Sequence, residues 1–426
     1  MALSAFAFPA FRVFAAAQFV SFTVLTVQII VRSWMVQELT GSPFLVALVP
    51  SLHLLPTLAL GFFGGELADR FDRRKIVFWC EAALIASYVS LALLVVTGVA
   101  EAWHVLATTA VIGVAYALAS PARQALLTDV VPPQIQRRAI GSYMLVIHLT
   151  LLAAPALGGT LLTMHGIGAA LMFSALLAVP FAFLNLRFTP LAAPIRAGAQ
   201  GKLIKNLVAG VGYIRSDPSM RSMFLGLLVM VLFVNTWGAM FPTIAQDVLG
   251  QGAAGLSGLT MALGAGAIIG AILAVFLEGR MPDAWQQFGA ALLFAGLVAL
   301  LAVSTSFPVS LAITVAASAA GAPFFINNMI ATQVGAADGF RSRVVSVRYV
   351  VLAIQPVGMM AVGAAAEMVG PQLALGGSAV IGAVLVGLIA VAGGVPMRAG
   401  RPVEAQPAPV EAEAVPAILV PQGGSD

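Results

Sequence analysis

Charged residues are scarce in this sequence. Asp, Glu, Lys and Arg together make up 9% of the 426 residues, whereas a typical soluble domain has about a quarter. The single cysteine, Cys80, excludes a disulfide within the chain, and four scattered histidines do not supply the clustered ligands of a metal site. A Walker A loop is absent as well. The sequence therefore argues against ATP-driven pumping, and we expect neither enzyme activity nor a bound cofactor or metal.

The chain consists largely of long apolar runs. Apolar residues make up 60% of the chain, and its mean hydropathy is +1.01. A helix of about 20 apolar residues crosses the ~30 Å hydrocarbon core of a bilayer, and we count twelve runs of this kind. They cover residues 11–37, 44–65, 76–98, 103–121, 140–164, 168–188, 221–247, 255–278, 285–305, 308–334, 343–366 and 372–395. The pattern predicts an all-α polytopic membrane protein with twelve transmembrane helices.

The positions of Lys and Arg predict the orientation in the bilayer. The loops after odd-numbered runs (38–43, 99–102, 165–167, 248–254, 306–307 and 367–371) hold no basic residue, and of 21 basic residues only Arg32 falls outside a cytoplasmic assignment. Because basic residues collect on the cytoplasmic side, we expect a multi-pass protein of the cell inner membrane with both termini cytoplasmic. This rule also accounts for the net charge of +4, so the charge does not indicate a nucleic-acid partner. The start of the chain lacks a basic n-region and a cleavage site, and we expect the first span to be retained.

The longest polar break divides the runs six and six. It covers residues 189–220, and its second part has Leu203, Leu207, Val211 and Ile214 at helical spacing. This pattern predicts an amphipathic helix on the inner membrane surface. The two halves resemble each other at an offset of about 200 residues, as expected for a duplicated six-helix unit. We expect an N-terminal bundle (1–188), a linker (189–220), a C-terminal bundle (221–396) and a disordered, Pro-rich cytoplasmic tail (397–426).

One stretch gathers the missing charge. GGELADRFDRRK (64–75) has seven charged residues in twelve, and it resembles the signature loop of the major facilitator superfamily: Gly, small or apolar residues, Asp-Arg, and then a basic cluster. The resemblance covers residues 1 to about 396 and implies two pseudo-symmetric six-helix bundles. The matching loop residues are Gly65, Asp69, Arg70, Asp72, Arg73, Arg74 and Lys75, with Asp72 where the superfamily usually has Gly.

The resemblance implies that this loop gates the protein. Asp69 would tie the N-terminal half to span 11 of the C-terminal half in the outward-open state. Gly65, which lacks a side chain, is expected to let neighbouring helices approach closely, and the basic residues are expected to bind anionic headgroups and to pair with Asp69 and Asp72. A loop that only anchors the topology is the alternative.

Span 5 carries a second resemblance. The narrower likeness, carried by ELTGSP, SPARQALLTDVVP and IRSDPSMRSMF, is to the enterobactin-exporter-like and macrolide-efflux-like branch. Gly141, Pro155, Gly158 and Gly159 resemble an antiporter motif, in which a proline and small residues let a helix bend and slide. Ordinary small-residue packing is the alternative. The arginine that drug antiporters of this superfamily carry inside span 4 is missing from residues 103–120.

Polar residues inside the spans are the candidates for cargo binding or proton coupling, because they are costly in a bilayer. Arg32 is a candidate for contacting an anionic substrate or pairing with Glu38, and Glu81 for a proton site or a partner of the basic loop. The histidines and amides also suit packing or interhelical hydrogen bonds. The full set is Gln28, Arg32, Glu38, His53, Glu81, His148, Asn235, Trp237, Asn327, Asn328 and Gln355.

These observations predict a secondary active transporter that works by alternating access. The leading interpretation is proton-coupled export of amphipathic small molecules, such as siderophores or drugs, by a monomer. An importer or facilitator of a specific metabolite is the alternative on the same fold. A receptor or structural membrane protein is a third possibility, against which the gating loop argues.

Overall fold

The computed structural model describes residues 2–184, 203–277, 280–281, 285–337 and 339–392. All regular elements within these ranges are helices. The α-helices are α1 (Pro9–Thr40), α2 (Pro43–Arg70), α3 (Arg73–Val96), α4 (Ala102–Asp129), α5 (Gln136–Leu184), α6 (Leu203–Ser216), α7 (Pro218–Val229), α8 (Phe241–Thr243), α9 (Gly252–Leu277), α10 (Ala290–Val303), α11 (Phe307–Val334), α12 (Arg341–Ala353), α13 (Gln355–Val369) and α14 (Pro371–Ala392). Short 3₁₀ helices are η1 (Ala2–Ala7), η2 (Pro133–Ile135) and η5 (Trp237–Met240), and π-helical turns are η4 (Met230–Val234), η6 (Ile244–Val248) and η7 (Trp285–Gly289).

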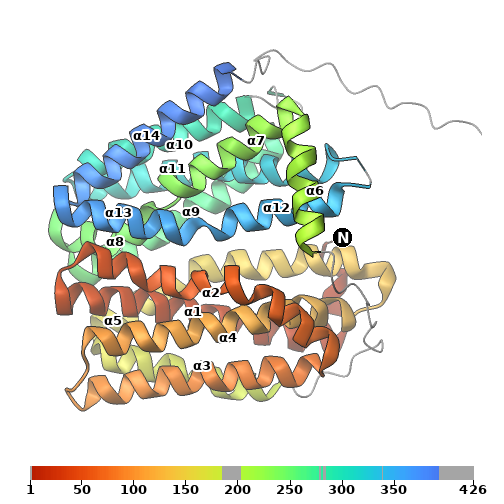
Figure 1. The fold of residues 1–426 in the computed structure, drawn as a ribbon. Helices are drawn as coiled ribbons and strands as arrows, with labels where there is room; N and C mark the ends of the chain where they lie inside the picture. Colours follow the sequence, from red (N-terminus) through yellow and green to blue (C-terminus); the bar gives the residue numbers. More distant parts are fainter. Residues whose placement is uncertain (1, 185–202, 278–279, 282–284, 338, 393–426) are drawn as a thin grey trace, which may run out of the picture.

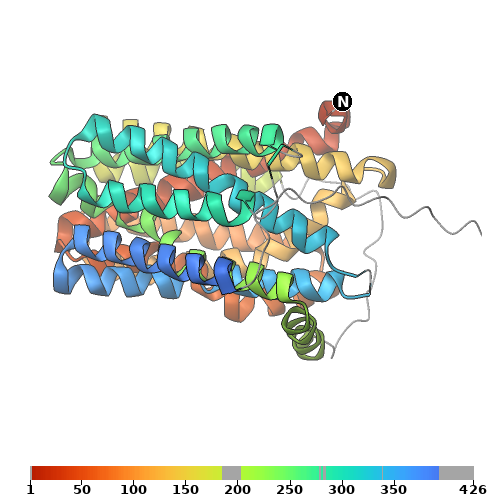
Figure 2. The same cartoon turned by 90° about the horizontal axis from the view of Figure 1, so that it is seen from above.

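The helices form two bundles that lie against each other. Figure 1 shows α1–α5 in one layer and α7–α14 in the other, with the long axes of most helices running the same way, and Figure 2 shows the same arrangement from above. Within the first bundle α1 packs on α5 and α2 on α4, and within the second α9 packs on α11 and α10 on α14. The bundles meet chiefly where α2 packs on α13 and α5 on α9.

The lengths and apolar surfaces of these helices suit a bilayer. Eleven helices in the described residues are long and apolar enough to cross a membrane. One of them, α5, bends at Gly166, whose φ of 77° is left-handed, so that it comprises the fifth and sixth predicted spans. Large apolar side chains such as Trp79, Val275 and Val303 are about two-thirds exposed or more (68%, 71% and 70%), as expected where lipid rather than water surrounds the protein. The prediction of an all-α membrane fold is confirmed.

The two ends of the molecule differ. At the turn end, on the left of Figure 1, short connections pass through Gly41, Gly98, Gly250 and Gly370, which all have positive φ. Glycine suits such positions because it has no Cβ to clash. The opposite end carries the 64–75 stretch, Arg341 and α6, and we call it the basic end.

The amphipathic segment predicted near residue 203 is the helix α6. It packs on α12, the half of span 11 nearest the basic end. The Tyr213 ring stacks on Phe340 with centroids 4.8 Å apart, and its hydroxyl accepts the backbone N–H of Ala337 at 3.2 Å. The apolar stripe is divided, because Ile214 is buried whereas Val211 is exposed. The predicted linker residues 189–202 and the predicted tail lie outside the described residues.

Candidate functional site

A cavity of about 270 Å³ lies between the two bundles. Its wall combines α1 and α2 of the first bundle with η5, α9 and α13 of the second. Its polar lining groups belong to Ser33, Asn235, Trp237, Thr260 and Gln355, and Ile29, Ile30, Pro50, Phe241 and Met359 are among its apolar ones. The structure thus brings together three of the candidate residues from the sequence, Asn235, Trp237 and Gln355.

The cavity lies where the helix of span 7 is interrupted. After α7 the chain passes through η4, a turn at Asn235 and Thr236, η5, α8 and η6. The backbone N–H of Asn235 donates to Met230 O at 2.7 Å, five residues back. Pro242 has no N–H, so the helical hydrogen bonds are also interrupted at this residue. Irregular backbone at membrane depth is tolerated where it is buried or lines a cavity, and π-turns within helices are frequent at functional sites.

Span 11 is interrupted beside it. Pro356 cannot donate to the carbonyl one turn earlier, and α12 ends at Ala353 while α13 begins at Gln355. The Gln355 amide donates to the backbone carbonyl of Asn235 at 2.8 Å. This bond satisfies a carbonyl at one helix break with a side chain from the other, so the two breaks form one rigid part of the cavity wall.

Hydrogen bonds join the two bundles at the turn end. The Gln37 amide of α1 donates to both carboxylate oxygens of Asp247 at 3.2 Å and accepts from the Thr243 hydroxyl at 2.8 Å. The Ser42 hydroxyl donates to Glu367. These bonds and the apolar packing beneath them hold the two bundles together at the turn end.

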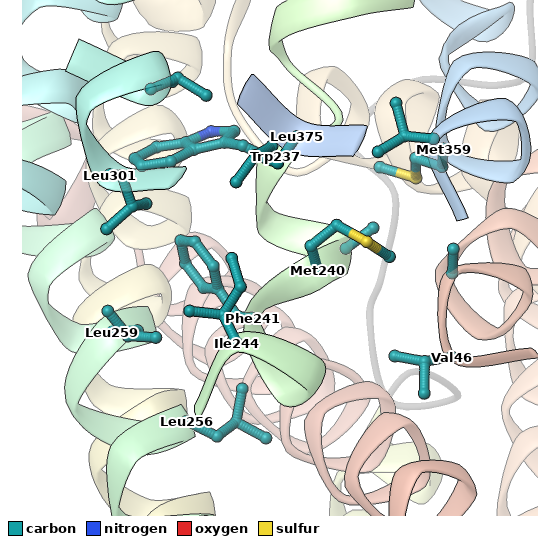
Figure 3. Packing of buried hydrophobic residues seen from close by; sticks show 14 of the residues in the cluster. Val46, Trp237, Met240, Phe241, Ile244, Leu256, Leu259, Leu301, Met359 and Leu375 are labelled. Carbon is teal, nitrogen blue, oxygen red and sulfur yellow. The ribbon is translucent and has the colours of Figure 1, made fainter. Parts of the chain in front are cut away.

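Apolar side chains from both bundles pack closely beneath these hydrogen bonds. Figure 3 shows Val46 of α2 in one apolar cluster with Met240, Ile244 and Met359 of the second bundle. A Cβ added to Gly363 would stand 2.7 Å from that of Ala47. Helices without side chains at the contact approach closely, which explains the small residue at this position.

The glycines of the antiporter-like motif differ in surroundings. A Cβ on Gly159 would overlap the Ser257 hydroxyl on α9, so this glycine belongs to the contact between the bundles. A Cβ on Gly158 would lie 3.4 Å from the Val27 side chain of α1, and one on Gly141 would meet open space. Pro155 is buried inside α5.

The charged loop at the basic end pairs within the first bundle. Arg70 pairs with Glu66 at 2.5 Å and Arg73 with Asp129 at 2.8 Å. Asp72 caps α3 by accepting the backbone N–H of Arg74 at 3.0 Å and pairs with its guanidinium at 2.8 Å. These hydrogen bonds from Arg74 lower the pKa of Asp72. Of the expected pairings with Asp72, the structure shows the one from Arg74.

Asp69 does not pair with the basic residues of the loop, and Gly65 is not a point of close approach between helices. The Asp69 carboxylate is exposed and makes no hydrogen bond or ion pair with a described residue, and Lys75 is exposed too. The close approach of α2 to α4 is at Gly64, where a Cβ would lie 2.8 Å from Ala117 O, whereas a Cβ on Gly65 would meet nothing within 4 Å. The helix turns Gly65 away from α4, so the expected role belongs to its neighbour.

Arg32 is fully buried within the first bundle. Its guanidinium donates to Gln28 Oε1 at 3.2 Å, to Thr108 Oγ1 at 2.6 Å and Thr109 Oγ1 at 3.3 Å, and to Ser87 O at 3.3 Å. Its donors are thus taken up by neutral acceptors. Glu38 instead is exposed and accepts from the Trp34 indole at 2.8 Å, so Arg32 and Glu38 do not pair.

Glu81 makes a buried ion pair that the sequence did not suggest. Arg123 Nη2 lies 2.6 Å from Glu81 Oε1, and both side chains are 3% exposed. The Ser21 hydroxyl donates to the same oxygen at 2.5 Å. The Arg123 guanidinium also lies over the rings of Phe22 and Tyr116 at 5.8 and 5.7 Å. Two of its nitrogens, Nε and Nη1, are buried without a partner among the described residues.

This pair corrects the placement of Arg123. The predicted fourth run ends at residue 121, which placed Arg123 in the loop after it, but α4 continues through Asp129 and buries this residue. Span 4 therefore does contain an arginine, further along the helix than the apolar run extends. The scarcity of charge could have indicated this pair. A lone carboxylate in span 3 needs a cation nearby, and Arg123 lies on a neighbouring helix.

The candidate polar residues of spans 10 and 11 hydrogen-bond to their neighbours within the second bundle. Asn327 donates to Gln286 Oε1 at 2.8 Å, and Asn328 accepts from Arg348 Nε at 3.0 Å. Arg348 has no acidic partner among the described residues. These residues do not line the cavity, and we interpret them as interhelical hydrogen-bonding groups.

The histidines complete the candidate set. His53 is buried beside the Tyr116 ring, with centroids 4.9 Å apart, and its Nδ1 has no partner among the described residues. The side chain of His148 lies outside the described residues. His53 is not among the residues that line the cavity described above.

Two six-helix bundles around a central cavity define a polytopic membrane transporter. Residues 1–416 match the transmembrane secretion effector family of the major facilitator superfamily, so the chain belongs to this family. It is a multi-pass secondary transporter and not an enzyme, and the predicted superfamily is confirmed.

Relatives of this chain include efflux proteins. It is 24% identical to the multidrug efflux pump Tap of Mycobacterium tuberculosis over 358 residues, which cover 81% of this chain and 84% of Tap. It is 22% identical to macrolide efflux protein A of Streptococcus pyogenes over 55% of this chain and 58% of that protein. A match to the MFS-type transporter YfiS of Bacillus subtilis is 29% identical but spans 30% of each chain.

Solved structures share the fold. A bacterial homologue of the human lysosomal transporter Spinster, in an inward-facing and unoccupied conformation, has a TM-score of 0.68 at 18% identity over 90% of this chain and 95% of that one. A D-xylose-proton symporter has a TM-score of 0.67 at 13% identity over 88% and 96%. At these identities the likeness establishes the fold alone.

Proposed function

We propose that this protein exports amphipathic small molecules, of drug or siderophore type, by proton antiport across the cell inner membrane. The observation that carries the proposal is the cavity between the two bundles, at the breaks of spans 7 and 11. Interrupted helices around a site between two repeats are the arrangement on which alternating access is built. The efflux activity in the names of the relatives supports the outward direction.

The protein works as a monomer whose two bundles rock about the cavity. The basic end faces the cytoplasm with both termini, in keeping with the distribution of Lys and Arg. The state described is then closed to the outside, because the Gln37–Asp247 and Ser42–Glu367 bonds join the bundles at the turn end. An Asp69 without a partner among the described residues suits this state, since its expected tie to span 11 forms when the cytoplasmic end is closed.

The buried Glu81–Arg123 pair carries the proton. A carboxylate with 3% exposure inside a membrane protein is stable because its cation is adjacent. Proton uptake neutralises the Glu81 carboxylate and breaks the ion pair, which leaves the Arg123 guanidinium held by the rings of Phe22 and Tyr116. Proton release restores the ion pair. Ionisable residues at such depth are the default candidates for proton relays.

The test uses inverted membrane vesicles energised to an acid interior, with a pH-sensitive fluorophore. Macrolides, siderophores, cationic dyes and chloramphenicol are added one at a time, and a transported substrate collapses the gradient. Asp69→Asn removes the gate and abolishes the response without loss of protein from the membrane. Glu81→Gln is expected to abolish the substrate-induced collapse of the pH gradient. The matched variant Glu38→Gln, at an exposed carboxylate, is expected to leave this collapse unchanged.

Two outcomes contradict the proposal. Silence across the panel, with the protein present in the membrane, favours an importer or facilitator. A normal response from Glu81→Gln removes the ion pair as the proton carrier.

A further inference from the structure

We infer that the cavity selects molecules that are uncharged when they bind, and that it rejects permanent cations and anions of the same shape. The inference rests on the proposed function, since it names the substrate class of the same site. It begins from the chemistry of the wall. None of the residues that line the cavity is Asp, Glu, Lys, Arg or His.

The hydrogen-bonding groups of the wall are neutral. Ser33 comes from the first bundle and Asn235 from the second, and neither side chain makes a hydrogen bond to a described residue. The Gln355 amide nitrogen is held by Asn235 O, which leaves its carbonyl oxygen for a ligand. Neutral donors and acceptors of this kind fix the orientation of a ligand in an otherwise apolar pocket.

The buried charges of the chain are committed elsewhere. Arg32 follows Val31 on the same helix as the lining residues Ile30 and Ser33, but its donors are taken up by Gln28, Thr108, Thr109 and Ser87. Glu81 and Arg123 form an ion pair with each other, and Arg348 donates to Asn328. A charged ligand would therefore enter the cavity without a counter-ion, and an uncompensated charge in an apolar site is costly.

The apolar part of the wall fits flat, compact ligands. Trp237 and Phe241 stand edge to face with centroids 5.2 Å apart, and the flexible Met359 lies opposite. Thioether side chains adapt to irregular apolar shapes. The volume of about 270 Å³ is at the lower bound of ordinary ligand pockets. The geometry thus points to small, uncharged, ring-containing molecules with one or two hydrogen-bonding groups.

The experiment compares three probes that share one ring and differ in charge. They are 2-naphthylmethanol, which is uncharged, 2-naphthoate, an anion, and (2-naphthylmethyl)trimethylammonium, a permanent cation. Binding to the purified full chain in nanodiscs is measured by equilibrium dialysis, with empty nanodiscs subtracted. We expect the alcohol to bind at least about tenfold tighter than either ion.

Substitutions then locate the selectivity. Asn235→Asp places a carboxylate in the wall and is expected to raise affinity for the cation about tenfold and to weaken the alcohol. The control, Asn327→Asp, adds the same charge to a residue outside the wall and leaves the order of the three probes unchanged. Equal binding of alcohol and cation to the wild type, no binding of the alcohol, or equal effects of the two Asp variants each overturn the inference.

The vesicle assay separates this inference from the proposed function. Proton-coupled efflux of cationic dyes alone, insensitive to Asn235→Asp, leaves export standing and removes the uncharged class. Selective binding of the alcohol without any gradient-driven flux retains the selectivity of the cavity and removes the exporter.

Discussion

The two bundles share a topology but bury different polar chemistry. The first buries charge: Arg32 with its neutral acceptors, and the Glu81–Arg123 pair. Its spans are long helices, and α1 runs unbroken from Pro9 to Thr40. The described part of the second buries hydroxyls, amides and one arginine, Arg348, but no carboxylate, and its spans 7 and 11 are interrupted beside the cavity.

This difference separates two tasks. Charges in a membrane interior need fixed partners, and regular helices hold those partners in register. Broken helices expose backbone carbonyls and small irregular spaces, which suit a binding wall. Under the proposed function, the first bundle holds and moves charge and the second supplies most of the cavity wall, so substitutions in each bundle are expected to fail differently.

The largest expected effect comes from leaving one charge alone. Arg123→Met strands Glu81 in a site where it is 3% exposed, and removal of one partner of a buried pair costs about 3–5 kcal/mol. The double variant Glu81→Gln/Arg123→Met removes both charges and should recover most of the free energy of unfolding. Thermal and denaturant unfolding in detergent measures it. If the single variant were as stable as the double, the pair would not hold a charged Glu81.

A smaller effect distinguishes the two lone arginines. Arg32→Met removes a donor to four acceptors, and loss of hydrogen bonds to a charged group costs about 1.5–3 kcal/mol. Arg348→Met in the second bundle loses chiefly the bond to Asn328, and should cost about 1.5 kcal/mol, at the lower end of that range. The unfolding midpoints of the two variants, measured side by side, check the order. A reversed order would show that the first bundle does not depend on its buried charge more than the second.

The sequence predicted the twelve spans well because apolar length is a property of each segment by itself. Asn235 and Thr236 place polar groups inside the apolar run of span 7, but polar residues in a span do not by themselves predict the helix break that the structure has there. Arg123 was misplaced because the apolar run ends near Pro121, whereas the helix continues to Asp129. Its partner Glu81 lies 42 residues away, and such a pairing depends on how helices pack.

The sequence also did not predict which face of each helix contacts its neighbours. Gly64 and Gly65 are adjacent, but only Gly64 faces α4. Ser33 lines the cavity and its neighbour Arg32 points into the first bundle. Neighbouring residues on a helix face different directions, and the hydropathy of a span that is apolar all round does not indicate which face is which.

The smallest expected effect compares the acidic caps of the two bundles. Asp72 caps α3 and also pairs with Arg74, whereas Asp217 caps α7 by accepting from the backbone N–H groups of Ser219 and Met220. Asn caps a helix about as well as Asp, so Asp72→Asn removes the ion pair and Asp217→Asn changes little. Because the Asp72 side chain is 33% exposed, the loss should be about 0.5 kcal/mol at neutral pH.

The stability that the Asp72–Arg74 pair contributes is expected to depend on pH in one direction. Arg74 lowers the pKa of Asp72 in the folded protein, so the carboxylate stabilises the fold above its unfolded pKa of about 3.9 and ceases to do so as the pH falls through the lower, folded value. The difference in unfolding midpoint between wild type and Asp72→Asn should therefore be present at pH 7 and shrink steadily below about pH 4. A difference that grew in acid would mean that Arg74 is not the partner that sets this pKa.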